Sequence, residues 1–155
     1  MIAMCGLCAY VVKITGRIME PKKYLDELTY KILGCAIEVH KQIGPGLIES
    51  VYEKCLCREL ELKGLKYQKQ IWVPLEYKGL QIDTELRLDL LVEDVLCVEL
   101  KAIEGLLPIH EAILLTYMRM LQKPKGILIN FCCANIFKEG QKTLVNELFA
   151  ALEKE

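Results

Sequence analysis

Two carboxylates and a lysine within one apolar stretch are the residues of this chain with the clearest chemical potential. Asp89 precedes the pair Glu99 and Lys101, and the sequence around them reads as two strands joined by an acidic turn. If the apolar rows of both strands face one core, residue 90 lies opposite 98 and residue 88 opposite 100. That register sets Asp89 directly across from Glu99. Like charges facing each other destabilise a sheet, so the pairing needs an explanation.

A divalent cation would explain the facing carboxylates. Hard ions such as Mg²⁺ take carboxylate oxygens, and one or two carboxylates plus a substrate phosphate suffice. A lysine beside them could orient or deprotonate a water that attacks phosphorus. The alternative is a solvated polar face on which Arg87 and Lys101 neutralise the acids. The hairpin alone leaves both interpretations open.

The alternation of apolar and polar residues over 86–101 predicts strands with one buried face. The expected inward row is Leu86, Leu88, Leu90, Val92, Leu96, Val98 and Leu100. Apolar spacings of three and four predict helices at about 25–43, 47–63, 109–121 and 143–152. Further strands are expected at 66–73, where Pro74 limits pairing to an edge, and at 126–133. Residues 75–82, with Gly79 as a turn signal, lead into the hairpin. The order ααβββαβα predicts an α/β sheet covered by helices.

Composition indicates one folded domain without a global attraction to nucleic acid. The chain has 155 residues, 53% hydrophobic and 26% charged, with a net charge of -1. Nucleic-acid binding would therefore depend on a local lysine cluster or on a dimer surface. Two lysine groups are candidates, with ordinary surface lysines as the alternative: Lys63, Lys66, Lys69 and Lys78, then Lys123, Lys125, Lys138 and Lys142. Trp72 and Tyr77 could stack on bases, or simply pack in the core or at a sheet edge.

The cysteines and the N-terminal residues predict a compartment. Several of the eight cysteines fall in apolar elements, where free Cys acts as a small hydrophobe, and this favours a reducing cytoplasm. Cys5 and Cys8 have the spacing of a redox or zinc half-site, but no second CxxC completes it. Residues 1–12 are too short to span a bilayer, and no later segment does so without charge. We expect residues 1–18 to be an extension, or an over-extended start before Met19, and residues 19–155 to be a single domain.

Two stretches resemble a known family. Gly46-Leu-Ile-Glu49-Ser-Val-Tyr52 matches the signature of the GxxExxY proteins. Leu107-Pro-Ile-His110-Glu-Ala-Ile-Leu-Leu-Thr-Tyr117 resembles the segment that follows the catalytic strand there. The similarity runs from about residue 28 to 146, with the motifs in the same order. The resemblance implies a PD-(D/E)XK nuclease-like domain, with a restriction-endonuclease-like αβββαβ core and a central mixed sheet flanked by helices.

The resemblance also implies roles for individual residues. Asp89 stands for the motif aspartate, Glu99 and Lys101 for the (D/E)xK pair, and Glu49 for an acid supplied by the preceding helix. The implied activity is that of a nuclease dependent on Mg²⁺ or Mn²⁺ and acting on DNA or RNA. Glu49, Asp89 and Glu99 would hold the ion, with the Leu100 carbonyl as a further ligand. Lys101 would position or activate the attacking water.

The signature itself has a physical interpretation. Gly46, Glu49 and Tyr52 lie three residues apart and therefore share one helix face. That face would lean over the hairpin, with Gly46 permitting close approach and Glu49 reaching the metal. The alternative is that Glu49 only complements the positive end of its helix.

The third helix carries further candidates and one departure from the family pattern. His110 and Tyr117 lie on nearly one face and, with Tyr52, are candidates for contacting the metal ligands or the substrate. Related nucleases often carry a glutamine four residues before the tyrosine, whereas this chain has Ile113. That departure and the weak basic field favour a rival: a non-catalytic module that binds nucleic acid or protein on the same fold. A structural homodimer is a third possibility.

Overall fold

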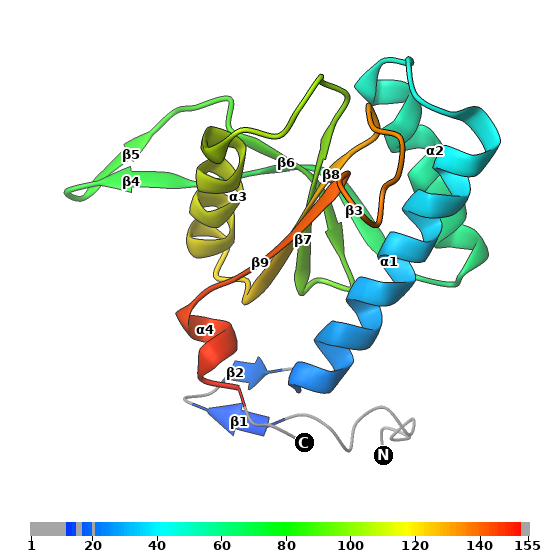
Figure 1. Cartoon of the computed structure of the whole chain (residues 1–155). Helices are drawn as coiled ribbons and strands as arrows, with labels where there is room; N and C mark the ends of the chain where they lie inside the picture. Colours follow the sequence, from blue (N-terminus) through cyan, green and yellow to red (C-terminus); the bar gives the residue numbers. More distant parts are fainter. Residues whose placement is uncertain (1–11, 15–16, 20, 153–155) are drawn as a thin grey trace.

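The computed structural model describes residues 12–14, 17–19 and 21–152 (Figure 1). The Cys5–Cys8 pair lies outside the described residues. In chain order the elements are β1 (Val12–Ile14), β2 (Arg17–Met19), α1 (Lys22–Ile43), α2 (Glu49–Leu62), β3 (Tyr67–Trp72), β4 (Leu75–Tyr77), β5 (Leu80–Ile82), β6 (Arg87–Val92), β7 (Leu96–Lys101), α3 (Pro108–Met120), β8 (Lys125–Asn130), β9 (Gln141–Val145) and α4 (Glu147–Ala150).

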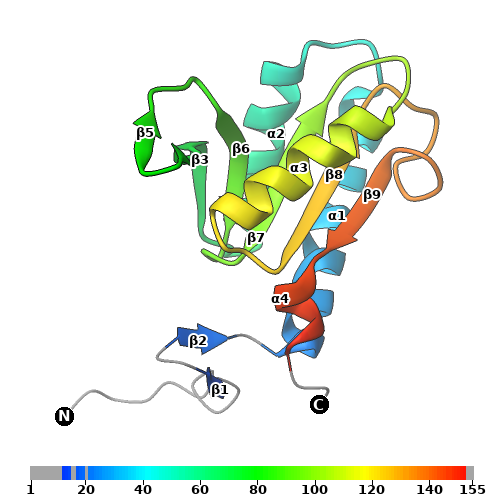
Figure 2. The same cartoon turned by 90° about the vertical axis from the view of Figure 1, so that its left-hand side faces the viewer.

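A five-stranded sheet in the order β3-β6-β7-β8-β9 forms the centre of the molecule. Only β7 and β8 are parallel, and α3 makes the crossover that a parallel pair requires. Helices α1 and α2 cover one face of the sheet, and α3 crosses β7 and β8 on the other (Figures 1 and 2). The predicted α/β architecture is therefore confirmed, and it is that of a restriction-endonuclease-like fold. β3 is an edge strand, as Pro74 predicted.

Both faces of the sheet are buried, which corrects one sequence expectation. Leu90 packs in the cluster formed with α1 and α2, but Leu88 packs with Leu91 in the cluster formed with α3. The predicted single inward row is therefore wrong at Leu86 and Leu88, which both pack on the α3 side. The pairing of β3 with β6 skips Gln70 and Asp89, and Gln70 has a φ of 51°. The edge strand is therefore distorted beside Asp89, the position at which the side chains of β6 change from one face of the sheet to the other.

The helix predicted at 143–152 is only partly present, because its first three residues form a strand and the helix covers Glu147–Ala150. Residues 143–145 belong to β9, which pairs antiparallel with β8. Thr143 and Val145 are β-branched and fit a half-buried edge strand. The only helix here is α4, which begins after Asn146, whose side chain accepts hydrogen bonds from the backbone N–H groups of Leu148 and Phe149. The strand predicted at 126–133 ends at Asn130.

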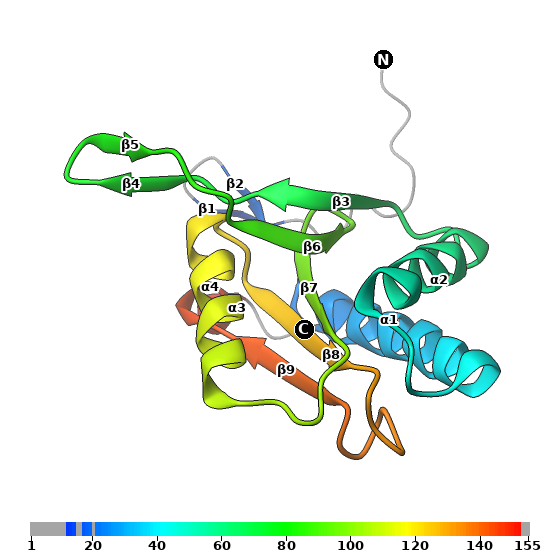
Figure 3. The same ribbon diagram turned by 90° about the horizontal axis from the view of Figure 1, so that it is seen from above.

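Strands β4 and β5 form a separate two-stranded sheet, which we call the arm. They pair antiparallel from Leu75–Ile82 to Tyr77–Leu80, with Gly79 at a φ of 82° in the turn. The arm projects beyond the ends of β3 and β6 and away from the body of the molecule (Figure 3). Among the described helices, none has the length and apolar character needed to cross a bilayer.

Candidate active site

Asp89 lies where β6 and β7 separate. The predicted hairpin register is present, because Leu90 pairs with Val98, but the ladder ends at that pair. Asp89 Oδ2 accepts a hydrogen bond from the Leu100 backbone N–H at 2.7 Å. This side-chain bridge replaces the backbone pairing expected between residues 88 and 100. The aspartate is therefore fixed to the strand that carries Glu99.

Glu99, which is buried, forms an ion pair with the partly buried Lys101 next to Asp89. Lys101 Nζ lies 2.8 Å from Glu99 Oε1 and 2.8 Å from the Leu100 carbonyl oxygen. Glu99 is 6% exposed, and its second oxygen, Oε2, is buried without a hydrogen-bond partner among the described residues. An unpaired buried carboxylate oxygen is costly, and such an atom in a native protein usually has a functional explanation.

The electrostatics of the site favour binding of positive charge. Burial, and then the charge of Asp89, raise the pKa of Glu99 to about 7 in spite of Lys101. Burial also raises the pKa of Asp89, against the opposing hydrogen bond from Leu100. Burial acts to lower the pKa of Lys101, but the hydrogen bond and charge of Glu99 and the nearby carboxylates raise it overall. Ionising both carboxylates here is unfavourable, and a divalent cation would relieve that cost.

Glu49 is the first residue of α2 and contributes to the same electrostatic environment. Its pKa is raised mainly by burial, with Lys101 lowering it and Asp89 raising it further. In the part of the chain that the structure describes, however, no three Asp, Glu, His or Cys side chains group closely enough to hold a metal ion. Mg²⁺ usually keeps several waters and needs only one or two carboxylates. Asp89 and Glu99 therefore fit such an ion as a pair, with Glu49 further out.

Tyr52 fixes the loop that precedes α2. Its hydroxyl donates to the Gly44 carbonyl at 2.7 Å and accepts from the Leu47 N–H at 3.1 Å. The side chain is fully buried, and its ring stacks on Phe131 with centroids 4.4 Å apart. Tyr52 therefore acts as a positioning residue for the loop leading to Glu49.

Gly46 is needed in this loop for its backbone conformation. It has a φ of 102°, which residues with a side chain rarely adopt. A Cβ built there would meet nothing within 4 Å, so the predicted role in close approach is wrong. Together Gly46 and Tyr52 give the GxxExxY spacing a physical purpose: both set the path of the chain into α2, where Glu49 begins the helix.

His110 and Tyr117 differ in their relation to the carboxylates. His110 Nδ1 accepts a hydrogen bond from the Leu107 N–H at 2.9 Å, and so caps α3. Tyr117 is 8% exposed, and its pKa is raised by burial and then by the charge of Glu99. Ile113, at the position where related nucleases often carry glutamine, packs in the apolar cluster under α3. The charge of the site therefore reaches Tyr117 on α3.

Two residues of the site were not predicted from the sequence. Gln70 Nε2 lies 2.6 Å from Glu53 Oε2 and 3.4 Å from Asp89 Oδ1, so it connects α2 to the aspartate. Glu53 follows Glu49 by four residues and lies on the same helix face, which is a signal that the sequence did offer. The sequence gives no comparable signal for Gln70, because its position next to Asp89 depends on how β3 aligns with β6.

We expect Gln70→Ala to lower the free energy of unfolding by about 1 kcal/mol, because it loses this bridge and keeps the strained backbone. Gln70→Gly loses the same bonds but removes the strain, so its stability should be within about 0.5 kcal/mol of wild type. Urea denaturation at pH 7 measures both values. Gln68→Ala, on the same strand, is the control. Equal losses in the alanine and glycine variants would show that the backbone of residue 70 is unstrained.

A mixed sheet with a carboxylate pair and a lysine at the split between two strands defines a nuclease-like α/β domain. A sequence model of the PD-(D/E)XK nuclease superfamily matches residues 26–143, most of the chain, including Glu49, Asp89, Glu99 and Lys101. The chain belongs to this superfamily, whose nucleases generally use divalent metal ions. No curated protein and no solved structure matches the chain.

Proposed function

We propose that this protein is a divalent-metal-dependent nuclease of the GxxExxY family that hydrolyses phosphodiester bonds in DNA or RNA. The observation that carries the proposal is the buried, unpartnered Oε2 of Glu99 beside Asp89. Membership of the nuclease superfamily supports it. The roles of Gly46 and Tyr52 in positioning Glu49 support the assignment to the GxxExxY family.

Asp89 and Glu99 would hold Mg²⁺ or Mn²⁺, with the Leu100 carbonyl as a further ligand and Glu49 acting from further out through a water bound to the ion. A bound ion supplies charge stabilisation for the phosphoryl group and lowers the pKa of its water. Asp89 is well suited to this task because one of its oxygens is already held by the Leu100 N–H, which fixes the direction of the carboxylate. Tyr117, whose pKa is raised by burial and then by the charge of Glu99, would contact substrate or solvent on the α3 side.

Lys101 would orient the attacking water and neutralise charge on the phosphate. Its pKa is raised overall, so the ammonium keeps its proton at neutral pH and is a poor general base. Glu99 and Leu100 hold it at 2.8 Å each, which limits its motion. Of the two roles expected for this lysine, positioning of the water is therefore favoured over deprotonation.

The test is cleavage of labelled single- and double-stranded DNA and RNA by the purified protein. We expect cleavage with millimolar Mg²⁺ or Mn²⁺ and none with EDTA. The rival function, a binding module without catalysis, is favoured by Ile113 packing in the apolar cluster instead of offering an amide. Calorimetry that detects nucleic-acid binding but no Mg²⁺ or Mn²⁺ binding at millimolar concentration would select the rival.

The cysteine chemistry supports a reducing cytoplasm as the place of action. Six cysteines are free in the part of the chain that the structure describes: Cys35, Cys55, Cys57, Cys97, Cys132 and Cys133. Cys132 and Cys133 are adjacent and only partly buried, so an oxidising compartment would expose them to modification.

A further inference from the structure

An exposed aromatic–guanidinium pair lies close to the carboxylates. Trp72 is 57% exposed, and the Arg87 guanidinium carbon lies 4.5 Å from the centroid of its ring. The two residues are partners in the register of β3 and β6. An indole this exposed is not packed in the core, so the expectation of core packing is wrong and the sheet-edge alternative holds. One face of the ring is occupied by Arg87.

The pair lies two residues along both strands from Gln70 and Asp89. At the usual rise of a strand, that separation is about 7 Å. A polymer whose reactive phosphate lay at Asp89 would therefore have an adjoining unit within reach of Trp72. Trp72 and Arg87 thus stand beside the candidate catalytic aspartate, and the arm begins immediately beyond them.

The arm carries a second pair of the same kind. Tyr77 is 62% exposed, and Lys78 Nζ lies 5.5 Å from the centroid of its ring. The arm continues the path of β3 and β6 away from the sheet (Figure 3). Aromatic rings with cations therefore recur along one extended ribbon that starts next to Asp89. Rings of this kind are the stacking platforms used for single-stranded nucleic acid.

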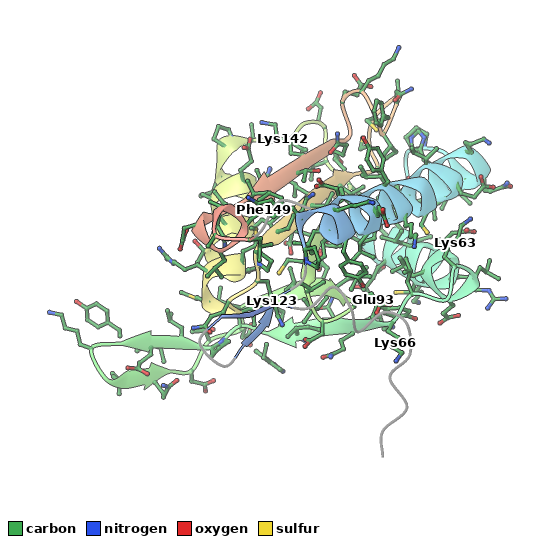
Figure 4. All side chains as sticks on the ribbon, turned by 90° about the horizontal axis from the view of Figure 1, so that it is seen from below. Lys63, Lys66, Glu93, Lys123, Lys142 and Phe149 are labelled. Carbon is green, nitrogen blue, oxygen red and sulfur yellow. The ribbon has the colours of Figure 1, made fainter. Side chains whose placement is uncertain are left out.

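The second lysine group does not form a free basic surface. In the second lysine group, Lys123 and Lys142 (Figure 4) form ion pairs with Asp94 and Glu111. Lys125 is buried and paired with Asp26, so its expected place on the surface is wrong. Three of these four lysines are already neutralised by acids. Stacking on Trp72 is the recognition chemistry that the structure places next to Asp89 on β3 and β6.

We propose that Trp72 and Arg87 bind the nucleotide next to the bond to be cleaved, and that the substrate is single-stranded nucleic acid. This inference rests on the proposed nuclease function. A base can stack on the free face of Trp72 only when it has left its own stack, which a single strand allows and a duplex resists. Arg87 holds the ring from its other face and contributes positive charge toward the backbone.

The test uses the fact that Trp72 is the only tryptophan of the chain. The full-length protein is titrated in EDTA with a 20-nucleotide single strand and with a duplex of the same length. We expect the single strand to quench tryptophan fluorescence and to bind about 10-fold more tightly than the duplex. In anisotropy measurements with a labelled single strand, Trp72→Ala should weaken binding about 10-fold, and Trp72→Phe should restore most of it. Tyr30→Ala, at a 70% exposed aromatic on α1, is the matched control and should bind as wild type does.

Each outcome decides the inference. Unchanged fluorescence together with unchanged binding by Trp72→Ala overturns it, as does equal or tighter binding of the duplex. A fluorescence change that follows protein concentration alone, with self-association lost in Trp72→Ala, also overturns it and assigns the surface to a second copy of the chain. Quenching by the single strand without cleavage in Mg²⁺ or Mn²⁺ upholds single-strand stacking on Trp72 while the proposed catalytic function fails. Cleavage that does not depend on Trp72 upholds the proposed nuclease function and overturns the inference about Trp72.

Discussion

Lys101→Met is expected to reduce cleavage by at least about 1,000-fold while leaving the fold intact. Methionine keeps much of the length and apolar stem of lysine but has no ammonium. The two hydrogen bonds of Nζ, to Glu99 Oε1 and to the Leu100 carbonyl, are then lost. Positioned positive charge at a phosphoryl group is among the largest single contributions to catalysis in such sites. Single-turnover cleavage with Mn²⁺ measures the loss, and circular dichroism checks the fold.

Asp89→Asn separates metal binding from the structural role of this side chain. The amide oxygen of asparagine still accepts a hydrogen bond from the Leu100 N–H, but the negative charge is gone. We therefore expect Mn²⁺ affinity to fall in Asp89→Asn and to persist in Lys101→Met. Lys31→Met, at an exposed position on α1, is the control for lost charge. Cleavage by Lys101→Met within about threefold of wild type would exclude the assigned role, since a positioned ammonium contributes far more than that.

The hairpin could be predicted because its signal is local. Alternating residues on both sides of a short turn fix the register, and the register alone brings Asp89 to the strand of Glu99. The face of the sheet on which Leu88 packs could not be predicted. A strand that is buried on both faces has no alternation of polar and apolar residues to show where its side chains change sides. The distortion comes from Gln70, a residue nearly twenty positions earlier that meets Asp89 only in the folded sheet.

The signature around Glu49 was found for the wrong physical reason at one position. Spacing of three suggested one helix face, yet Gly46 lies before α2 and serves the loop through its positive φ. The Tyr52 hydroxyl donates a hydrogen bond to that loop, a contact that the spacing of residues along the sequence does not predict. Likewise 143–145 have apolar spacing compatible with a helix, and pairing with β8 decides the outcome. Local sequence patterns identified the residues of the signature and the C-terminal segment, and tertiary contacts determined their structural roles.

Glu99→Gln is expected to stabilise the metal-free protein at alkaline pH while abolishing its activity. The pKa of Glu99 is raised from 4.5 to about 7 in the folded protein, so between these values the folded state binds more protons than the unfolded state. Stability therefore falls as pH rises through this window, and the full cost of the buried charge is present by about pH 8. Glutamine avoids that cost but leaves Lys101 with a weaker partner. We expect a net gain of about 2 kcal/mol at pH 8 and almost none at pH 4.5.

Thermal unfolding in EDTA at several pH values measures this difference, which corresponds to about 4–8 °C in Tm at pH 8. Glu104→Gln, at an exposed position in the loop before α3, is the control and should follow wild type at every pH. Added Mn²⁺ should then reverse the order, because an ion that binds only the folded wild type raises its Tm in proportion to the logarithm of metal concentration. A variant no more stable than wild type at pH 8 would mean that Glu99 Oε2 is satisfied in solution. The strongest reason for assigning a cation to this carboxylate pair would then be removed.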